Sequence, residues 1–170
     1  NAASFLKPDS FYTVNMAGAG GFPATSYKDA LFLAADFTVK NPDLEGNGPL
    51  VHGTDFTVEW NPSVSVNKPT ADRLVSGDIL GVIWLLDATG APTHMCPTIH
   101  SAGKFTIPGS AITEYQDIAK ARGFDGTKMI LLRDSIAHQV VRLPTADPTT
   151  NKRRIDMLTM VSWAQLMDVQ

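Results

Sequence analysis

Short apolar stretches separated by segments rich in Gly, Pro, Asn and Asp run along the whole chain. This pattern is typical of β-strands joined by turns. In residues 55–60 the apolar Phe56, Val58 and Trp60 alternate with polar residues, so these three side chains face one side of a sheet. Residues 79–86 are apolar on both faces, which indicates a central strand. Further strands are predicted at residues 11–16, 31–39, 104–107, 127–133, 136–143 and 153–169.

One helix is predicted near residues 110–122. An apolar stripe at helical spacing marks it, made of Ile112, Tyr115, Ile118 and Ala119. The Ser110 hydroxyl is suited to cap the first turn of this helix, and Gly123 is suited to end it. With about eight to nine strands and one short helix, the sequence predicts an all-β fold in the form of a two-sheet antiparallel β-sandwich. We interpret residues 3–170 as a single domain and residues 1–2 as a cleavage remnant.

The composition supports this fold class and excludes some functions. Charged residues make up 18% of the 170-residue chain, below the usual share of roughly 25%. The net charge of −3 provides no basic surface for nucleic acid. No apolar run approaches the roughly 20 residues that cross a bilayer, so no transmembrane segment is predicted in this chain. Cys96 is the single cysteine, which excludes an internal disulfide.

The segment THMCPTIH contains the residues that most resemble a metal-ligand set. His94, Cys96 and His100 point to one side of an extended strand because their separations are even. Imidazole and thiolate together suit Zn or Cu, and Pro97 allows a kink that brings His100 closer. A fourth ligand would come from His52, His138 or a carboxylate. The alternative is a plain strand, in which Cys96 is a small buried apolar residue and both histidines lie at exposed strand ends.

Other candidate sites have structural explanations. Asp43, Glu45 and Asn47 alternate as in a calcium loop but lack its remaining ligands, and turns are rich in such residues for backbone reasons. The glycine run of residues 17–22 lacks the Lys and the helix of a phosphate-binding loop. Cys96 with His94 or His138 is the one candidate thiolate pair. No catalytic set is assembled and no cofactor is predicted, so we expect a protein that is not an enzyme.

The aromatic residues have two possible roles, in the core or in sugar binding. Trp60 and Trp84 lie in strongly apolar strands, which favours the core. Trp163 lies in MVSWAQLM and is the candidate for an exposed face or an interface. An exposed tryptophan stacks on sugar rings, so a carbohydrate-binding module is one alternative function.

Four segments that begin between Asp55 and Pro108 carry a resemblance to a known class of module: DFTVEWNP, GVIWLLDATG, MC and GKFTIPGSAI. They resemble the Ig-like or fibronectin-type β-sandwich modules of bacterial cell-envelope proteins, which are often lipoproteins. In those modules a strand ending in Trp-x-Pro precedes a hydrophobic strand, an Asp/Gly turn, a strand with Cys and an edge with the letters FTIP. The resemblance implies an extracytoplasmic setting: periplasmic, anchored to the outer membrane, or secreted. It implies no activity and no functional residue.

We therefore expect a non-catalytic extracytoplasmic β-sandwich domain with a binding, adhesion or structural role in a cell-envelope protein. Its partner would be a protein or a glycan. The first alternative is a Zn or Cu protein that uses His94, Cys96 and His100, and the second is the carbohydrate-binding module.

Overall fold

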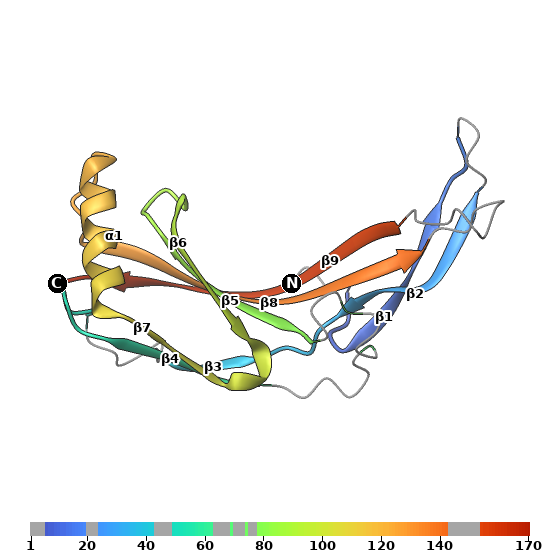
Figure 1. Cartoon of the computed structure of the whole chain (residues 1–170), viewed down its shortest axis with the longest axis horizontal. Helices are drawn as coiled ribbons and strands as arrows, with labels where there is room; N and C mark the ends of the chain where they lie inside the picture. Colours follow the sequence, from blue (N-terminus) through green and yellow to red (C-terminus); the bar gives the residue numbers. More distant parts are fainter. Residues whose placement is uncertain are drawn as a thin grey trace. The chain divides into compact units, whose positions relative to one another are not determined.

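The computed structural model describes residues 6–19, 24–42, 49–62, 69, 74, 78–142 and 154–170. These residues form nine β-strands and one α-helix (Figure 1), which confirms the all-β class with one short helix. The elements are β1 (Ser10–Met16), β2 (Thr25–Leu33), β3 (Thr38–Asn41), β4 (Phe56–Asn61), β5 (Leu80–Leu86), β6 (Pro92–Ile99), a 3-10 turn η2 (His100–Ala102), β7 (Lys104–Ile107), α1 (Gly109–Ala121), β8 (Lys128–Arg142) and β9 (Arg154–Asp168). The two-sheet sandwich itself stays a prediction.

The chain divides into two compact units. The first unit takes its described residues from Asn1–Asp36, Val64–Leu80 and Ile136–Val161, and the second from Phe37–Ser63, Gly81–Ser135 and Ser162–Gln170. Strands β8 and β9 contribute residues to both units. Because these strands are shared, the single domain over residues 3–170 also stays a prediction.

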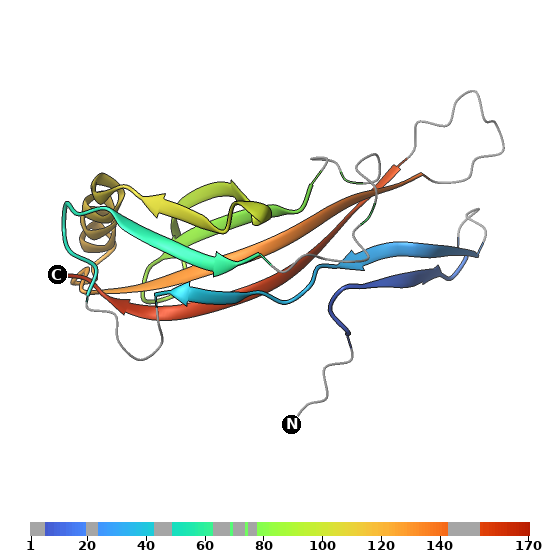
Figure 2. The ribbon, with the colours of Figure 1, turned by 90° about the horizontal axis from the view of Figure 1, so that it is seen from below.

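The second unit contains a three-stranded sheet in the order β3-β4-β7, whose strands lie side by side in Figure 2. Both pairings are antiparallel, with Val58 opposite Phe105 and Trp60 opposite Val39. A four-stranded sheet has the order β6-β5-β8-β9. Strand β5 is interior in this sheet, as its apolar faces predicted.

The core of the second unit draws side chains from both of these sheets and from α1. Its members are Leu50, Val58, Trp60, Ile83, Leu85, Ile107, Ile112, Tyr115, Ala119, Met129, Leu131, Met167 and Val169. Three of the four residues predicted as the apolar stripe of the helix are fully buried here, and Ile118 is half-buried. Burial of one such large apolar side chain contributes roughly 1.5–3 kcal/mol, so this face of α1 fixes the helix to the sheets.

The start of α1 differs from the prediction. Ser110 lies inside the helix, and Pro108 occupies the N-cap position without a side-chain cap. The free backbone N–H of Gly109 instead donates to the Asp55 carboxylate, 2.8 Å away. A β-carbon at Gly109 would lie 2.3 Å from the carbonyl carbon of Gly53. A residue distant in sequence therefore caps the helix, and only glycine allows the close approach.

The end of α1 follows the prediction. Gly123 has a φ of +89°, the left-handed conformation that glycine adopts without strain. Its N–H donates to the carbonyl of Lys120, and the N–H of Phe124 donates to that of Ala119. These hydrogen bonds satisfy carbonyl groups of the last turn, and the helix ends there, before β8.

The strand boundaries differ from the sequence prediction in two regions of the chain. The strand expected over residues 31–39 is two strands, because β2 ends at Leu33 and β3 begins at Thr38. Conversely, the two strands expected at 127–133 and 136–143 are one continuous strand, β8. The two predicted segments are separated by polar Asp134 and Ser135, and both are buried within the strand, as is Arg133.

The first unit is built on a hairpin of β1 and β2, paired antiparallel with Phe11 opposite Phe32. The centroids of the Phe11 and Phe32 rings lie 5.0 Å apart. Phe32 belongs to a second apolar cluster that also contains Ala34, Leu74, Ile79 and Ala137. Each unit thus has its own buried apolar cluster.

Candidate functional site

Strand β6 carries the sequence that resembled a metal site. His94 and Cys96 are half-buried, whereas Met95, Pro97 and Ile99 are exposed. The strand prediction for this segment is therefore confirmed, and the alternation follows the strand period. His100 lies just after the strand, in η2, and is only 5% exposed. The expectation that both histidines lie at exposed ends is wrong for His100, because its ring packs in the core.

Each of the three predicted ligands has other neighbours. The Nε2 atom of His94 lies 3.3 Å from Oε2 of Glu114 on α1. Cys96 packs against the core of the second unit, and burial raises the pKa of its thiol. His100 contacts Arg133. Among the described residues, no group of three or more His, Cys, Asp and Glu side chains is placed to hold a metal ion.

The remaining predicted ligands also have defined positions. His52 is exposed in the segment before β4. His138 belongs to the first unit, where its Nε2 lies 3.4 Å from Oδ1 of Asp156. Asp43, Glu45 and Asn47 lie outside the described residues, as does part of the glycine run of residues 17–22. Metal binding by His94, Cys96 and His100 stays a prediction.

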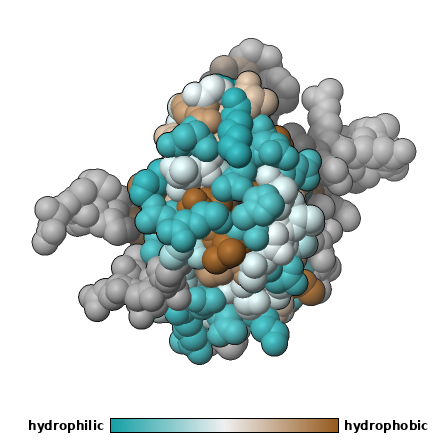
Figure 3. Space-filling view, turned by 90° about the vertical axis from the view of Figure 1, so that its left-hand side faces the viewer, coloured by the Kyte–Doolittle hydropathy of each residue, from teal (hydrophilic) through white to brown (hydrophobic). Residues whose placement is uncertain are grey.

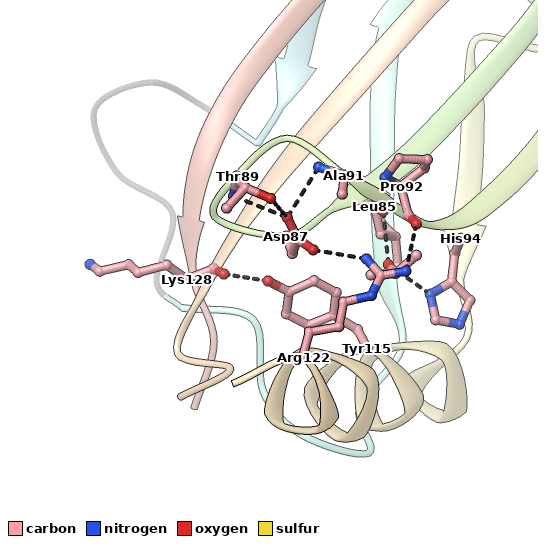
Figure 4. Close-up of polar contacts among 10 residues, drawn as sticks. Leu85, Asp87, Thr89, Ala91, Pro92, His94, Tyr115, Arg122 and Lys128 are labelled. Carbon is pink, nitrogen blue, oxygen red and sulfur yellow. Dashed lines mark hydrogen bonds and ion pairs between the residues drawn. The ribbon is translucent and has the colours of Figure 1, made fainter. Parts of the chain in front are cut away.

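A polar network joins α1 to the turn between β5 and β6 (Figure 4). At its centre is Asp87, which is 1% exposed. Its Oδ1 accepts from the Thr89 hydroxyl at 2.6 Å and from the backbone N–H groups of Thr89 and Ala91 at 3.0 and 3.1 Å. Its Oδ2 accepts from Nη1 of Arg122 at 2.8 Å. The Asp87 carboxylate therefore has four donors.

These donors stabilise the charged form of Asp87. The Thr89 hydroxyl has the largest effect, and with Arg122 and the backbone groups it lowers the Asp87 pKa to about 2 against the opposing effect of burial. Arg122 also donates to the carbonyl of Pro92 at 3.2 Å. Because Arg122 follows the last turn of α1, its positive charge lies at the favourable end of the helix dipole.

Tyr115 makes a second connection from α1. Its hydroxyl donates to the carbonyl of Lys128, at the start of β8. Burial, with smaller contributions from Asp87 and Asp125, raises the Tyr115 pKa to about 12. We call Asp87, Thr89, Tyr115 and Arg122 the helix clamp. The face of the molecule that includes α1 is mainly hydrophilic with a small hydrophobic patch (Figure 3).

A second polar group in this unit surrounds Arg133, which has no exposed surface. Its guanidinium carbon lies 4.3 Å from the centre of the Trp60 ring and 4.8 Å from that of Phe37. Nη1 donates to the carbonyl of Asp134, and Nη2 lies 3.2 Å from Nδ1 of His100. Stacking on two aromatic faces offsets part of the cost of burying the cation. We call Phe37, Trp60, His100 and Arg133 the arginine cluster.

Burial lowers the Arg133 pKa to about 10, while Asp134 acts in the opposite direction. Arg133 therefore remains charged at neutral pH. Gly81 makes room for it, since a β-carbon there would lie 2.8 Å from Nη2 of Arg133. The Asp134 carboxylate accepts from the indole N–H of Trp84 at 2.7 Å and from the Ser162 hydroxyl at 2.6 Å.

Sequence reasoning missed the arginine cluster, although a signal was present. Met129, Leu131 and Arg133 alternate along β8, so Arg133 occupies a core position of a strand. The sequence predicted that Trp60 and Trp84 lie in the core. Trp60 is buried, as predicted, and Trp84 is half-buried. Trp163 is half-buried and packs against the core of the second unit, which does not fit a fully exposed sugar-stacking platform.

Comparisons with known proteins give no relative. The sequence matches no protein-family model, and no match was found among curated proteins or solved structures. No helix in the described ranges has the length and apolar character required to cross a bilayer.

Proposed function

We propose that this chain is a non-catalytic β-rich module with a binding, adhesion or structural role in an extracytoplasmic protein of the bacterial envelope. The observation that carries this proposal is the helix clamp. A carboxylate that acts as a general acid or base needs a pKa near the working pH and an approachable oxygen. Asp87 has neither, because its pKa is about 2 and both oxygens accept hydrogen bonds inside the protein.

Other groups with reactive chemistry support the same proposal. The Cys96 pKa is raised by burial, which favours the thiol over the nucleophilic thiolate. The Tyr115 pKa of about 12 keeps its hydroxyl protonated as a donor to Lys128. Each group is shifted away from reactivity by the contacts that hold α1 or the core in place.

The envelope setting rests on the resemblance over residues 55–108. The described residues of that segment form β4, β5, β6, η2 and β7. A partner of the module would be a protein or a glycan of the cell surface.

The direct test of the proposed function is turnover by the purified protein on a broad panel of ester, glycoside and phosphate substrates. We expect no hydrolysis above that of a heat-denatured sample. Hydrolysis that follows the protein through a second purification step and disappears in C96S or D87N would overturn the proposal. D117N is the matched control for D87N, because Asp117 lies exposed on α1.

The alternative function is Zn or Cu binding by His94, Cys96 and His100. One observation favours it: His94, Cys96 and His100 occupy alternate positions that are less exposed than Met95, Pro97 and Ile99 between them. Elemental analysis of protein purified without a His tag or chelator tests it. About one equivalent of metal, lost in C96S, would support the alternative. Metal-free protein with a fully folded spectrum would contradict it.

A further inference from the structure

The positive charge of Arg133 is not balanced by an ion pair. Charged side chains are almost never fully buried unless they are paired, yet Arg133 has no exposed surface. Within the described part of the chain, no carboxylate forms an ion pair with its guanidinium. The side chain of Asp134 leaves the opposite face of β8, and its carboxylate accepts from Trp84 and Ser162. Asp134 therefore opposes the effect of burial on the Arg133 pKa only in part.

One edge of the Arg133 guanidinium has no protein acceptor. The Trp60 and Phe37 rings lie against the group, and Nη1 donates to the carbonyl of Asp134. Nη2 lies 3.2 Å from Nδ1 of His100. Nε is buried as well, but no residue that the structure describes accepts its N–H. Because all guanidinium N–H groups lie in the plane of the group, only an acceptor at this edge can satisfy Nε.

Ser135 provides a second buried donor on the same face of β8. Side chains two residues apart on a strand point to the same face, with their attachment points about 7 Å apart. Ser135 has no exposed surface, and its hydroxyl has no hydrogen-bond partner among the described residues. A buried donor without an acceptor is unfavourable. One acceptor between the two positions can take a hydrogen bond from each.

We propose that Arg133 and Ser135 form an internal site for a small monovalent anion of the halide class. An anion accepts both hydrogen bonds and also neutralises the guanidinium, which a water molecule cannot do. Both donors are buried, so a carboxylate or phosphate attached to a larger ligand does not reach them. The ion is structural, and this property goes beyond the proposed function and does not depend on it.

The proposed ion links stability to the halide concentration. An ion enclosed by the folded chain binds the folded state and not the unfolded state, so it stabilises the folded state by mass action. For one site, the equilibrium constant of unfolding falls by up to about tenfold for each tenfold rise in chloride above the Kd. Gluconate is a monovalent anion too large for such a site, so it supplies ionic strength without occupying it.

Urea unfolding in sodium chloride and in sodium gluconate, at equal ionic strength and neutral pH, tests the site. We expect the stability of the wild type to rise with chloride and not with gluconate. S135A should need about tenfold more chloride for the same gain, because one hydrogen bond to a charged acceptor is lost. S110A is the matched control, since Ser110 is exposed on α1, and should retain the wild-type dependence. Equal stability of the wild type in both salts would overturn the proposal, as would an unchanged chloride dependence in S135A.

Removal of the charge gives the larger effect. R133M should lose the chloride dependence altogether, whereas K120M, which changes an exposed cation, should retain it. A chloride dependence that persists in R133M would contradict the site.

A crystallographic measurement keeps the test decisive if R133M does not fold. Wild-type protein refolded and crystallised in sodium bromide locates the ion by the anomalous scattering of bromine. We expect an anomalous peak within hydrogen-bond distance of both Nε of Arg133 and Oγ of Ser135. A water molecule at that position, with no anomalous signal, would refute the proposal.

Discussion

At the scale of single residues, the carboxyl group of Asp87 makes the fold sensitive to acid. Its pKa is lowered from 3.8 to about 2, so the unfolded chain binds more protons than the folded one between these values. The contribution of Asp87 is complete above about pH 4 and is lost as the pH falls toward its folded pKa. The shift corresponds to roughly 2 kcal/mol of unfolding free energy.

Urea unfolding at about pH 4.5 and about pH 2.5 measures this contribution. We expect the wild type to lose more stability over this interval than D87N, in which the group no longer titrates. D117N should behave as the wild type does. An equal loss in wild type and D87N would show that Asp87 does not titrate with the depressed pKa.

Cys96 provides a second prediction at this scale. Its thiol packs against the core and its pKa is raised by burial, so the reactive thiolate is scarce and shielded. We expect alkylation near pH 8 to be at least about tenfold slower in the folded protein than in the same protein unfolded in urea. The rate is followed by mass spectrometry. Equal rates would place the thiol at the surface.

The sequence pattern predicted the burial of some of these residues but not of others. Trp60 was assigned to the core because it alternates with Phe56 and Val58 in an apolar strand. The burial of Arg133 was missed because charged residues are rarely buried unless paired, and its partners Phe37, Trp60 and His100 are distant in sequence. The alternation of apolar and polar residues predicts which side chains share a face of a strand. It does not predict contacts between residues that are distant in sequence.

At the scale of elements, the N-terminus of α1 depends on two residues outside the predicted cap. Gly109→Ala places a β-carbon against the backbone of Gly53, where no flexible side chain can move away. We expect this substitution to cost about 1–3 kcal/mol of unfolding free energy, although alanine is the better helix former. Urea denaturation measures the change, and a stabilised G109A would contradict the close approach.

The cap itself gives a separate prediction. Asp55→Ala removes the acceptor of the Gly109 N–H and should cost about 1 kcal/mol. Ser110→Ala removes a side chain that makes no cap bond and should be nearly neutral. Thermal unfolding of the two variants under the same conditions shows whether Asp55 or Ser110 caps the helix. A larger loss in S110A than in D55A would restore the cap expected from the sequence.

Element boundaries show where local sequence patterns are insufficient. Strands β4, β5 and β7 lie within one residue of their predicted positions, because apolar side chains and turn residues mark their ends. The continuity of β8 could not be predicted, since the polar run of Arg133, Asp134 and Ser135 resembles a turn until tertiary partners bury it. The cap from Asp55 is tertiary for the same reason.

At the scale of the whole molecule, the apolar cores and the buried polar groups have different roles. Each compact unit has its own apolar cluster, and buried Asp87 and Arg133 of the second unit contact residues of other elements. The proposed function requires that these groups stabilise the fold instead of reacting with a ligand. Their removal should therefore lower the unfolding free energy of the whole chain.

The measurement that tests this most directly is a double-mutant cycle of D87N, R122M and their combination, with unfolding free energies from urea titration at neutral pH. K120M is the control, because Lys120 lies exposed in the last turn of α1. We predict losses of about 1–3 kcal/mol for each single variant and a coupling of about 1 kcal/mol between them, with K120M unchanged. Strictly additive effects, or variants as stable as the wild type, would contradict the structural role of the helix clamp.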